Sequence, residues 1–197
     1  MIPILIPAAG ASSRMQGRDK LMEEIDGQPL LRRTVTQACD TGAPVIVTLP
    51  PEPHPRWAAL AGLNAAKVSV PDAALGISAS LRRGLVALPP GSTAVMVLLA
   101  DLPDLTTADL ARSLAAPMQD PDRDAWRGAT EDGKAGHPVV LGKRLLQQVQ
   151  DLTGDEGFAP LLKGLGSRLA LIPLPGQAAR TDLDTPDAWA QWRARQP

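Results

Sequence analysis

Four short apolar runs, separated by segments long enough to form helices, constrain the fold of this chain more than any other feature. The runs occupy residues 2–6, 44–49, 66–70 and 94–100. Continuous apolar runs of this length are typical of strands buried on both faces, and neighbouring parallel strands need a crossover of about a dozen residues or more. Apolar residues recur at helical spacing in the intervening segment 30–38. The pattern therefore predicts an α/β fold with a mostly parallel sheet and right-handed crossovers.

The second half of the chain continues the alternation. We expect helices at residues 75–88, 106–118, 143–152 and 154–162, and strands at residues 126–129, 139–141 and 169–174. A last helix is expected after Thr185-Pro186, with Trp189 and Trp192 as packing residues. At 197 residues with 44% hydrophobic side chains, the chain suits one globular domain that spans residues 1–197.

The composition excludes several classes of function. A net charge of −1 and an aromatic content of 3% argue against nucleic-acid binding, which needs a basic surface and side chains that stack on bases. Cys39 is the single cysteine and His54 and His137 are the two histidines, so an internal disulfide is excluded and a Cys/His zinc site has too few ligands. The sequence opens without a basic, apolar leader, and no run approaches about 18 apolar residues. We therefore expect a cytoplasmic protein without nucleic-acid or membrane partners.

A stretch of small residues follows the first apolar run at once and leads into the cations Arg14, Arg18 and Lys20. Unpaired amides in such a loop form an anion-binding concavity, to which Arg14 and Lys20 add a planar fork and a point charge. The stretch matches neither the Walker A pattern nor Gly-x-Gly-x-x-Gly, and an ordinary turn followed by surface cations is the alternative interpretation. We interpret it as a cradle for a nucleoside triphosphate, formed by Ala8, Ala9, Gly10, Ser12, Ser13, Arg14 and Lys20.

A second small-residue segment opens the helix expected at residues 75–88. It reads Gly76-Ile77-Ser78-Ala79-Ser80. A helix entry of this kind can lie against a ligand, because its amides and hydroxyls suit a polar base or a phosphate. Ser78 is equally well explained as an N-cap. The segment is not the Gly-x-Ser-x-Gly turn of a hydrolase, because Ser80 replaces the final glycine.

Two aspartates occupy positions that suit a hard cation. Asp101 follows the strand expected at 94–100, and ligands of open α/β sheets bind outside the carboxyl ends of strands. Asp184 precedes Thr185-Pro186 near the end of the chain. A turn position for Asp101 and a helix cap for Asp184 are the structural alternatives. His137 ends the loop 131–136, where its imidazole either faces a second substrate or fixes the loop by hydrogen bonding.

These stretches together resemble the motifs of the MobA-like nucleotidyltransferases, and most closely those of the molybdenum cofactor cytidylyltransferases. They cover nearly the whole chain in the family's order, with Leu102 where Met is usual and Phe158 near the place of a usual Arg. The segments that carry the resemblance are Ala8-Ala9-Gly10-x-Ser12-Ser13-Arg14-Met15 with Lys20, Gly76-Ile77-Ser78-Ala79-Ser80-Leu81, Ala100-Asp101-Leu102-Pro103, Gly136-His137-Pro138-Val139, Gly154-Asp155-x-Gly157 and Asp182-Leu183-Asp184-Thr185-Pro186.

The resemblance implies a single three-layer Rossmann-like nucleotidyltransferase domain, with a mostly parallel sheet and helices on both faces. It implies Mg²⁺ bound by Asp101 and Asp184, and a nucleotide pocket that Ser78 and Ser80 help to line. It also implies catalytic roles for Arg14, Lys20 and Asp101.

The reaction implied by the resemblance is transfer of CMP from CTP to the phosphate of molybdopterin or its molybdenum form, with release of pyrophosphate. Contact with a recipient molybdoenzyme or its chaperone would follow. Three alternatives stay open at this point: a GTP-using molybdopterin guanylyltransferase, a cytidylyltransferase that acts on a sugar or polyol phosphate, and a non-catalytic nucleotide- or pterin-binding module.

Overall fold

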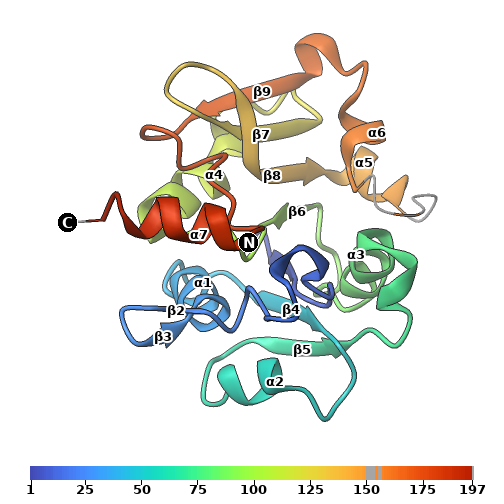
Figure 1. Ribbon diagram of the computed structural model, residues 1–197. Helices are drawn as coiled ribbons and strands as arrows, with labels where there is room; N and C mark the ends of the chain where they lie inside the picture. The colour runs from blue at the N-terminus through green and yellow to red at the C-terminus, as the bar shows by residue number, and fades with distance from the viewer. Residues whose placement is uncertain (150–153, 155–156, 197) are drawn as a thin grey trace.

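A seven-stranded mixed sheet forms the centre of the protein, in the order β5-β4-β1-β6-β8-β7-β9 (Figure 1). The computed structural model describes residues 1–149, 154 and 157–196. Strands β1, β4, β5 and β6 are mutually parallel, β8 runs antiparallel to β6 and β7, and β9 is parallel to β7. The prediction of a mostly parallel sheet is confirmed. The strands are β1 (Ile4–Pro7), β4 (Val45–Leu49), β5 (Ala66–Ser69), β6 (Ala94–Val97), β7 (Ala125–Ala129), β8 (Ala135–Gly142) and β9 (Leu169–Pro173).

Strand β1 lies at the point where the order of the sheet reverses. The chain first adds β4 and then β5 on one side of β1, and later places β6 on the other side. Ile4 is paired with both Val45 and Met96, and all three side chains are buried. In open α/β sheets, the crevice outside the carboxyl ends of such strands is the usual ligand site.

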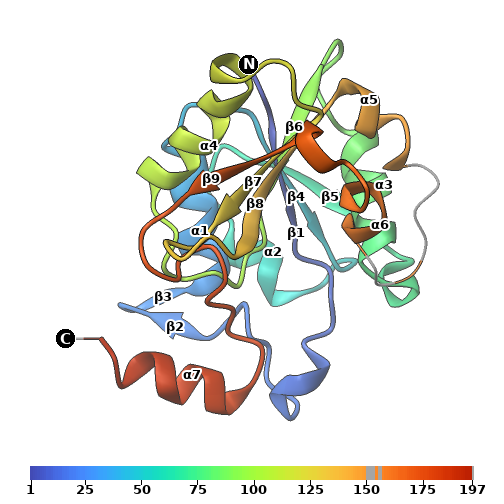
Figure 2. The same cartoon turned by 90° about the horizontal axis from the view of Figure 1, so that it is seen from above.

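Helices cover both faces of the sheet, so the predicted three-layer arrangement is confirmed (Figure 2). Along β1, Ile4 and Ile6 enter one apolar core and Leu5 enters the other, as the period of two in a strand requires. The first core includes residues of α1 (Leu30–Cys39), α4 (Thr107–Gln119) and α7 (Pro186–Arg193). The second includes residues of α3 (Ile77–Val86) and α5 (Lys143–Leu146), with α6 (Ala159–Leu162) packed against it.

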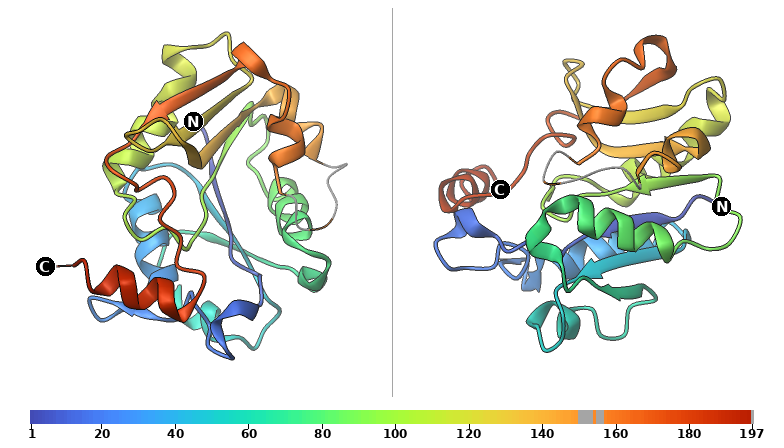
Figure 3. Two further views of the ribbon diagram at one scale, coloured as in Figure 1. Left: turned by 45° about the horizontal axis from the view of Figure 1, so that its top comes forward. Right: turned by 90° about the vertical axis from the view of Figure 1, so that its right-hand side faces the viewer.

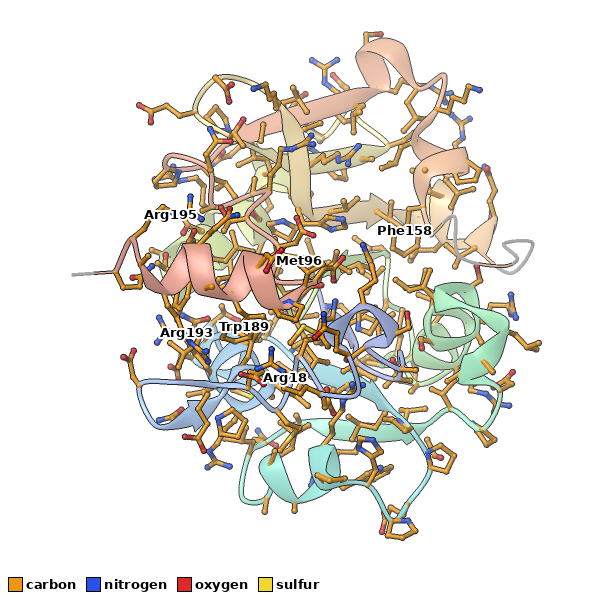
Figure 4. The ribbon with its side chains drawn as sticks, in the orientation of Figure 1. Arg18, Met96, Phe158, Trp189, Arg193 and Arg195 are labelled. Carbon is orange, nitrogen blue, oxygen red and sulfur yellow. The ribbon has the colours of Figure 1, made fainter. Side chains whose placement is uncertain are left out.

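Helix α7 packs against a small hairpin that the sequence pattern did not predict. Strands β2 (Glu24–Ile25) and β3 (Gln28–Pro29) are joined by Asp26 and Gly27, both at positive φ, as a tight two-residue turn requires. Trp189 and Arg193 project from α7 toward this hairpin and α1 (Figure 4), and Arg193 lies 3.2 Å from Glu23.

Several predicted boundaries differ from the structure. Strand β6 ends at Val97 rather than residue 100, and a short helix, α2 (Pro55–Ala59), lies between β4 and β5. The helix expected from residue 154 begins at Ala159, and α5 ends at Leu146. Residues 150–153 and 155–156 of those predictions lie outside the described residues. Helix α4 begins as expected, because Thr106 and Asp109 cap each other's backbone amides. None of the described helices is long and apolar enough to cross a membrane.

Candidate active site

A cavity of about 640 Å³ lies outside the carboxyl ends of β1 and β6. It collects chain segments that are far apart in sequence, and the loop after β1 lies beside the beginning of α7 (Figures 2 and 3). Ser80 of α3 borders it from the side of the second core. The predicted site residues on its wall are Ala8, Ala9, Gly10, Ser12, Ser13, Arg14, Lys20, Ser80, Asp101 and Asp184.

The loop of residues 8–14, here called the cradle loop, follows strand β1, and most of its backbone N–H groups have no hydrogen-bond acceptor among the described residues. The Ala8 N–H still donates to Thr48 O at 2.9 Å, in continuation of the β1–β4 ladder. From Ala9 to Arg14, no backbone N–H donates a hydrogen bond to any other residue that the structure describes. A left-handed residue, Ser12 at φ 54°, turns the loop into the short 3₁₀ helix Ser13–Met15. Consecutive unpaired amides of this kind form an anion-binding surface.

Four charged side chains, here called the charged quartet, meet at the wall of this cavity. Lys20 Nζ contacts both Asp101 Oδ2 and Asp184 Oδ1. Arg14 Nη2 lies 2.5 Å from Asp184 Oδ2, and the Arg14 side chain is 69% exposed. The carbonyl oxygen of Asp101 accepts a hydrogen bond from Leu183 N–H at 3.1 Å, which fastens the C-terminal segment to the end of β6. The structure therefore brings together the two cations and the two carboxylates that the sequence analysis predicted as site residues.

Two members of the quartet, Asp184 and Lys20, have shifted pKa values. Burial alone would raise the pKa of Asp184, but the hydrogen bond and charge of Lys20, with the charge of Arg14, lower it below 3.8. Burial alone would lower the pKa of Lys20, but Asp101 and Asp184 raise it above 10.5. Asp184 is therefore ionised and Lys20 protonated at neutral pH.

The carboxylates have the chemistry and the spacing to share a divalent cation. Their oxygens contact one and the same ammonium nitrogen, so they lie close enough to contact one metal ion. Asp101 Oδ1 is buried and has no hydrogen-bond partner among the described residues. The described residues contain no group of three or more His, Cys, Asp or Glu side chains that could hold a metal. An ion here would complete its shell with water and substrate phosphate, as Mg²⁺ commonly does.

Ser78, which the sequence grouped with Ser80, does not line the cavity. Its side chain is fully buried, and both its hydroxyl and its amide donate to the Gly154 carbonyl, at 2.7 and 3.2 Å. It is not a cap either, because α3 begins after Gly76 and has no side-chain cap. Asp184 likewise is not a helix cap: Thr185 caps α7 by accepting from Ala188 N–H.

His137 lies at a second, smaller cavity of about 230 Å³. This cavity has mainly apolar walls and shares Ile77 and Leu99 with the larger one, so the two are adjacent. Burial and the nearby charge of Arg127 lower the pKa of His137 to about 4, and the imidazole is neutral at pH 7. Its Nδ1 is buried without a hydrogen-bond partner in the part of the chain that the structure describes.

Arg56 and Asp19 are site-forming residues that sequence reasoning missed. Arg56 is 2% exposed, hydrogen-bonds to the cradle loop and does not line the large cavity. Its only sequence signal was the position after Pro55 at the start of a short helix, which says nothing about a partner about 40 residues away. Asp19 had one signal, its place directly before Lys20.

A switch-point cavity that pairs a loop of unpaired amides and two cations with two carboxylates suits a polyphosphate together with a divalent ion, which is the requirement of a nucleotidyltransferase. The chain belongs to the family described as MobA-like NTP transferase domain, which matches residues 4–170. The predicted class of enzyme is thereby confirmed. Among curated proteins, none matches the chain.

Solved structures share the fold of the chain. Rv0371c from Mycobacterium tuberculosis H37Rv is 26% identical, with a TM-score of 0.83, over 97% of this chain and 96% of that one. Its complex with manganese aligns at 24% identity and a TM-score of 0.82, over 99% of each chain. CMP:2-keto-3-deoxy-manno-octonic acid synthetase complexed with CTP shares the fold at 15% identity and a TM-score of 0.77, over 98% of each chain.

Proposed function

We propose that the protein transfers CMP from CTP to the phosphate of molybdopterin or its molybdenum form and releases pyrophosphate. The observation that carries the proposal is the meeting of the charged quartet and the free amides of the cradle loop around one cavity. The choice of CTP and molybdopterin follows from the sequence motifs that resemble molybdenum cofactor cytidylyltransferases. A neighbour in fold that was crystallised with CTP is consistent with the choice of base.

The chain's own groups would act by positioning and charge. The amides of the cradle loop bind phosphate oxygens, and Arg14 and Lys20 exchange a carboxylate partner for the triphosphate. An anionic oxygen of the acceptor phosphate attacks the α-phosphorus, a new P–O bond forms, and the bond to the bridging oxygen breaks. Pyrophosphate leaves with that electron pair, stabilised by Lys20. No general base is needed, because the attacking oxygen is already ionised.

Asp101 and Asp184 would hold Mg²⁺, with Asp101 Oδ1 as an available buried ligand atom. The ion supplies charge neutralisation at the triphosphate when it is bound. The manganese complex of Rv0371c supports a divalent ion in a relative of similar fold. Among the chain's own residues, Leu183 keeps the two carboxylates together through its hydrogen bond to the Asp101 carbonyl.

The smaller cavity favours an acceptor with a flat apolar part over a sugar or polyol phosphate. Its walls include Leu81, Val97, Val139 and Phe158, which offer few partners for a row of hydroxyl groups. A neutral His137 and the partly buried Arg127 supply two polar groups at its edge. A molybdopterin guanylyltransferase would use the same cavity, so the choice between CTP and GTP is tested by experiment.

The decisive experiment measures pyrophosphate release from the four nucleoside triphosphates, each with molybdopterin, with a polyol phosphate and with no acceptor. We expect release with CTP and molybdopterin, and its loss in Asp101→Ala and Lys20→Ala proteins that keep a cooperative unfolding transition. Binding of a nucleoside triphosphate without turnover on any acceptor would favour the non-catalytic module. Full turnover by either variant would refute the assigned site.

A further inference from the structure

The guanidinium group of Arg56 binds backbone carbonyl oxygens of the cradle loop. Nη1 donates to the carbonyl oxygens of Ala8 at 2.7 Å and Gly10 at 2.8 Å. Nε and Nη2 donate to the two carboxylate oxygens of Asp19 at 2.8 and 2.6 Å, and Nη2 also reaches Ser12 Oγ at 3.2 Å. A guanidinium is a planar fork of donors, so this one buried group fixes four acceptor residues relative to one another.

The bonds to the two carbonyls determine where the loop amides point. A trans peptide unit is planar, and its N–H points opposite to its C=O. When Arg56 holds the carbonyls of Ala8 and Gly10, it therefore turns the N–H groups of Ala9 and Ala11 away from itself. Ala9 and Ala11 line both the large cavity and a neighbouring cavity of about 480 Å³, whereas Arg56 lines only the second of these two. The amides are thus directed away from Arg56, and the large cavity is the one of the two that Arg56 does not line.

The bonds to Asp19 and Ser12 reach the other half of the phosphate site. Ser12 Oγ accepts from Lys20 N–H at 3.3 Å, and Asp19 Oδ1 accepts from Leu21 N–H at 3.0 Å. The backbone on both sides of Lys20 is therefore tied to the same cluster. Burial alone would raise the pKa of Asp19, but the hydrogen bonds and charge of Arg56 lower it, so the Asp19 carboxylate is ionised at neutral pH.

We infer that Arg56 is a positioning residue for nucleotide phosphates, which sets the direction of the cradle-loop amides and the place of Lys20 without touching the substrate. The inference rests on the proposed function, since it assigns a phosphate site to the large cavity. It predicts an effect on nucleotide binding and turnover beyond any effect on stability. A lysine cannot replace Arg56, because one ammonium cannot hold two carbonyls and both carboxylate oxygens together.

The test compares Arg56→Lys with a matched control, Arg32→Lys. Arg32 donates to the carbonyls of Ala59 and Ala61 at 2.8 and 3.0 Å, so it anchors the far end of α2 by the same chemistry and does not contact the cradle loop. For Arg56→Lys we expect kcat/KM for the nucleotide to fall by about 100-fold, with a higher KM for nucleotide, a lower kcat and an unchanged KM for the acceptor. For Arg32→Lys we expect kcat/KM within about twofold of wild type. The inference is overturned if Arg56→Lys keeps kcat/KM within about threefold, or if both variants lose it equally.

Calorimetric titration with the nucleotide and Mg²⁺, without acceptor, separates this inference from the proposed reaction. If the wild type binds nucleotide but never turns over, the proposed reaction fails, and weaker binding by Arg56→Lys alone still supports the positioning role. If wild-type protein binds no nucleotide, both fail. Should Arg56→Lys not fold, Asp19→Asn keeps Arg56 and the shape of its partner, and we expect it to weaken nucleotide binding about tenfold. Wild-type affinity in a folded Asp19→Asn protein would also overturn the inference.

Discussion

Replacing Lys20 by methionine removes the ammonium that separates Asp101 from Asp184 and keeps the apolar stem. The three side chains are 19%, 12% and 16% exposed, so the pairs are partly buried. Exposed ion pairs contribute up to about 1 kcal/mol, and breaking a buried pair costs about 3–5 kcal/mol. We expect Lys20→Met to lower the free energy of unfolding at pH 7 by about 2–3 kcal/mol. For a chain of this size, that corresponds to a fall in Tm of roughly 4–12 °C.

The pH dependence of this loss has a defined sign. In the wild type the pKa of Asp184 is lowered, so its stabilisation is present above the ordinary pKa of 3.8 and lost as pH falls through the folded value. The raised pKa of Lys20 keeps its stabilisation fully present below 10.5. In the variant, two carboxylates face each other without the ammonium, and proton uptake relieves their repulsion. The difference between the two proteins is therefore largest near pH 7 and shrinks toward pH 4.

A divalent cation should restore what the variant has lost. An ion at about 100 times its Kd stabilises the folded state by about 2.7 kcal/mol, which is roughly 5–11 °C in Tm here. The wild type should gain less from Mn²⁺ without nucleotide, because Lys20 already lies between the carboxylates. Thermal unfolding with and without Mn²⁺ at pH 7 and at pH 4.5 measures both effects.

The double variant Lys20→Met/Asp101→Asn is the control for the ion-binding effect, because it removes one of the two carboxylate charges. It should lose most of the Mn²⁺-dependent rise in Tm. An equal rise in the double variant would show that the ion binds elsewhere. An unchanged Tm of Lys20→Met at pH 7 would refute the electrostatic reasoning altogether.

Two further predictions concern the second half of the chain. The pKa of His137 is lowered from 6.5 to about 4. Between these two pH values the unfolded chain binds a proton at His137 and the folded chain does not, so the free energy of unfolding falls as pH drops from 6.5 to about 4. We expect the free energy of unfolding, measured with denaturant, to fall by about 2 kcal/mol less between pH 7 and pH 4.5 in His137→Gln than in the wild type. An equal fall in both proteins would contradict this. Gly136→Ala would place a methyl carbon 2.1 Å from the Ala179 carbonyl oxygen, and we expect a loss of about 3 kcal/mol in the unfolding free energy. Gly10→Ala meets nothing within 4 Å and should unfold within about 0.5 kcal/mol of wild type, so similar losses in both would argue against the packing explanation.

Most of the residues that the sequence analysis assigned to the site meet at one cavity, because strand ends and motifs determine their position. Asp101 could be placed because it follows a continuous apolar run, and the carboxyl ends of parallel strands meet at one edge of the sheet. Arg14 and Lys20 follow β1, the neighbouring strand, so they had to approach the same edge. Asp184 lies beyond the matched family region 4–170, and its placement came from the motif before Thr185-Pro186. That residues 1–197 form one domain stays a prediction.

Tertiary partners decided what the sequence could not predict. Ser78 and Ser80 are two residues apart on one helix entry, but Ser78 hydrogen-bonds to the Gly154 carbonyl and does not line the cavity. Strand β8 is antiparallel to β6 because it forms a long hairpin with β7. The alternation of apolar segments in the sequence does not indicate such a hairpin. Arg56 binds main-chain carbonyls, and main-chain acceptors leave no trace in the identity of a residue.

Under the proposed function, the pairing within the charged quartet predicts that binding of the nucleotide and binding of the divalent cation depend on each other. In the free protein the two positive and two negative side chains neutralise one another, so neither partner is available without breaking a partly buried pair. A triphosphate that takes Arg14 and Lys20 leaves Asp101 and Asp184 uncompensated, and a cation bound by the carboxylates releases Arg14 and Lys20 for phosphate. We therefore expect each ligand to remove part of the cost of binding the other, which would be positive coupling between two sites, reciprocal by thermodynamic necessity. This coupling requires cations and carboxylates to be paired directly in the free protein, and the contacts of Lys20 with both carboxylates meet that requirement.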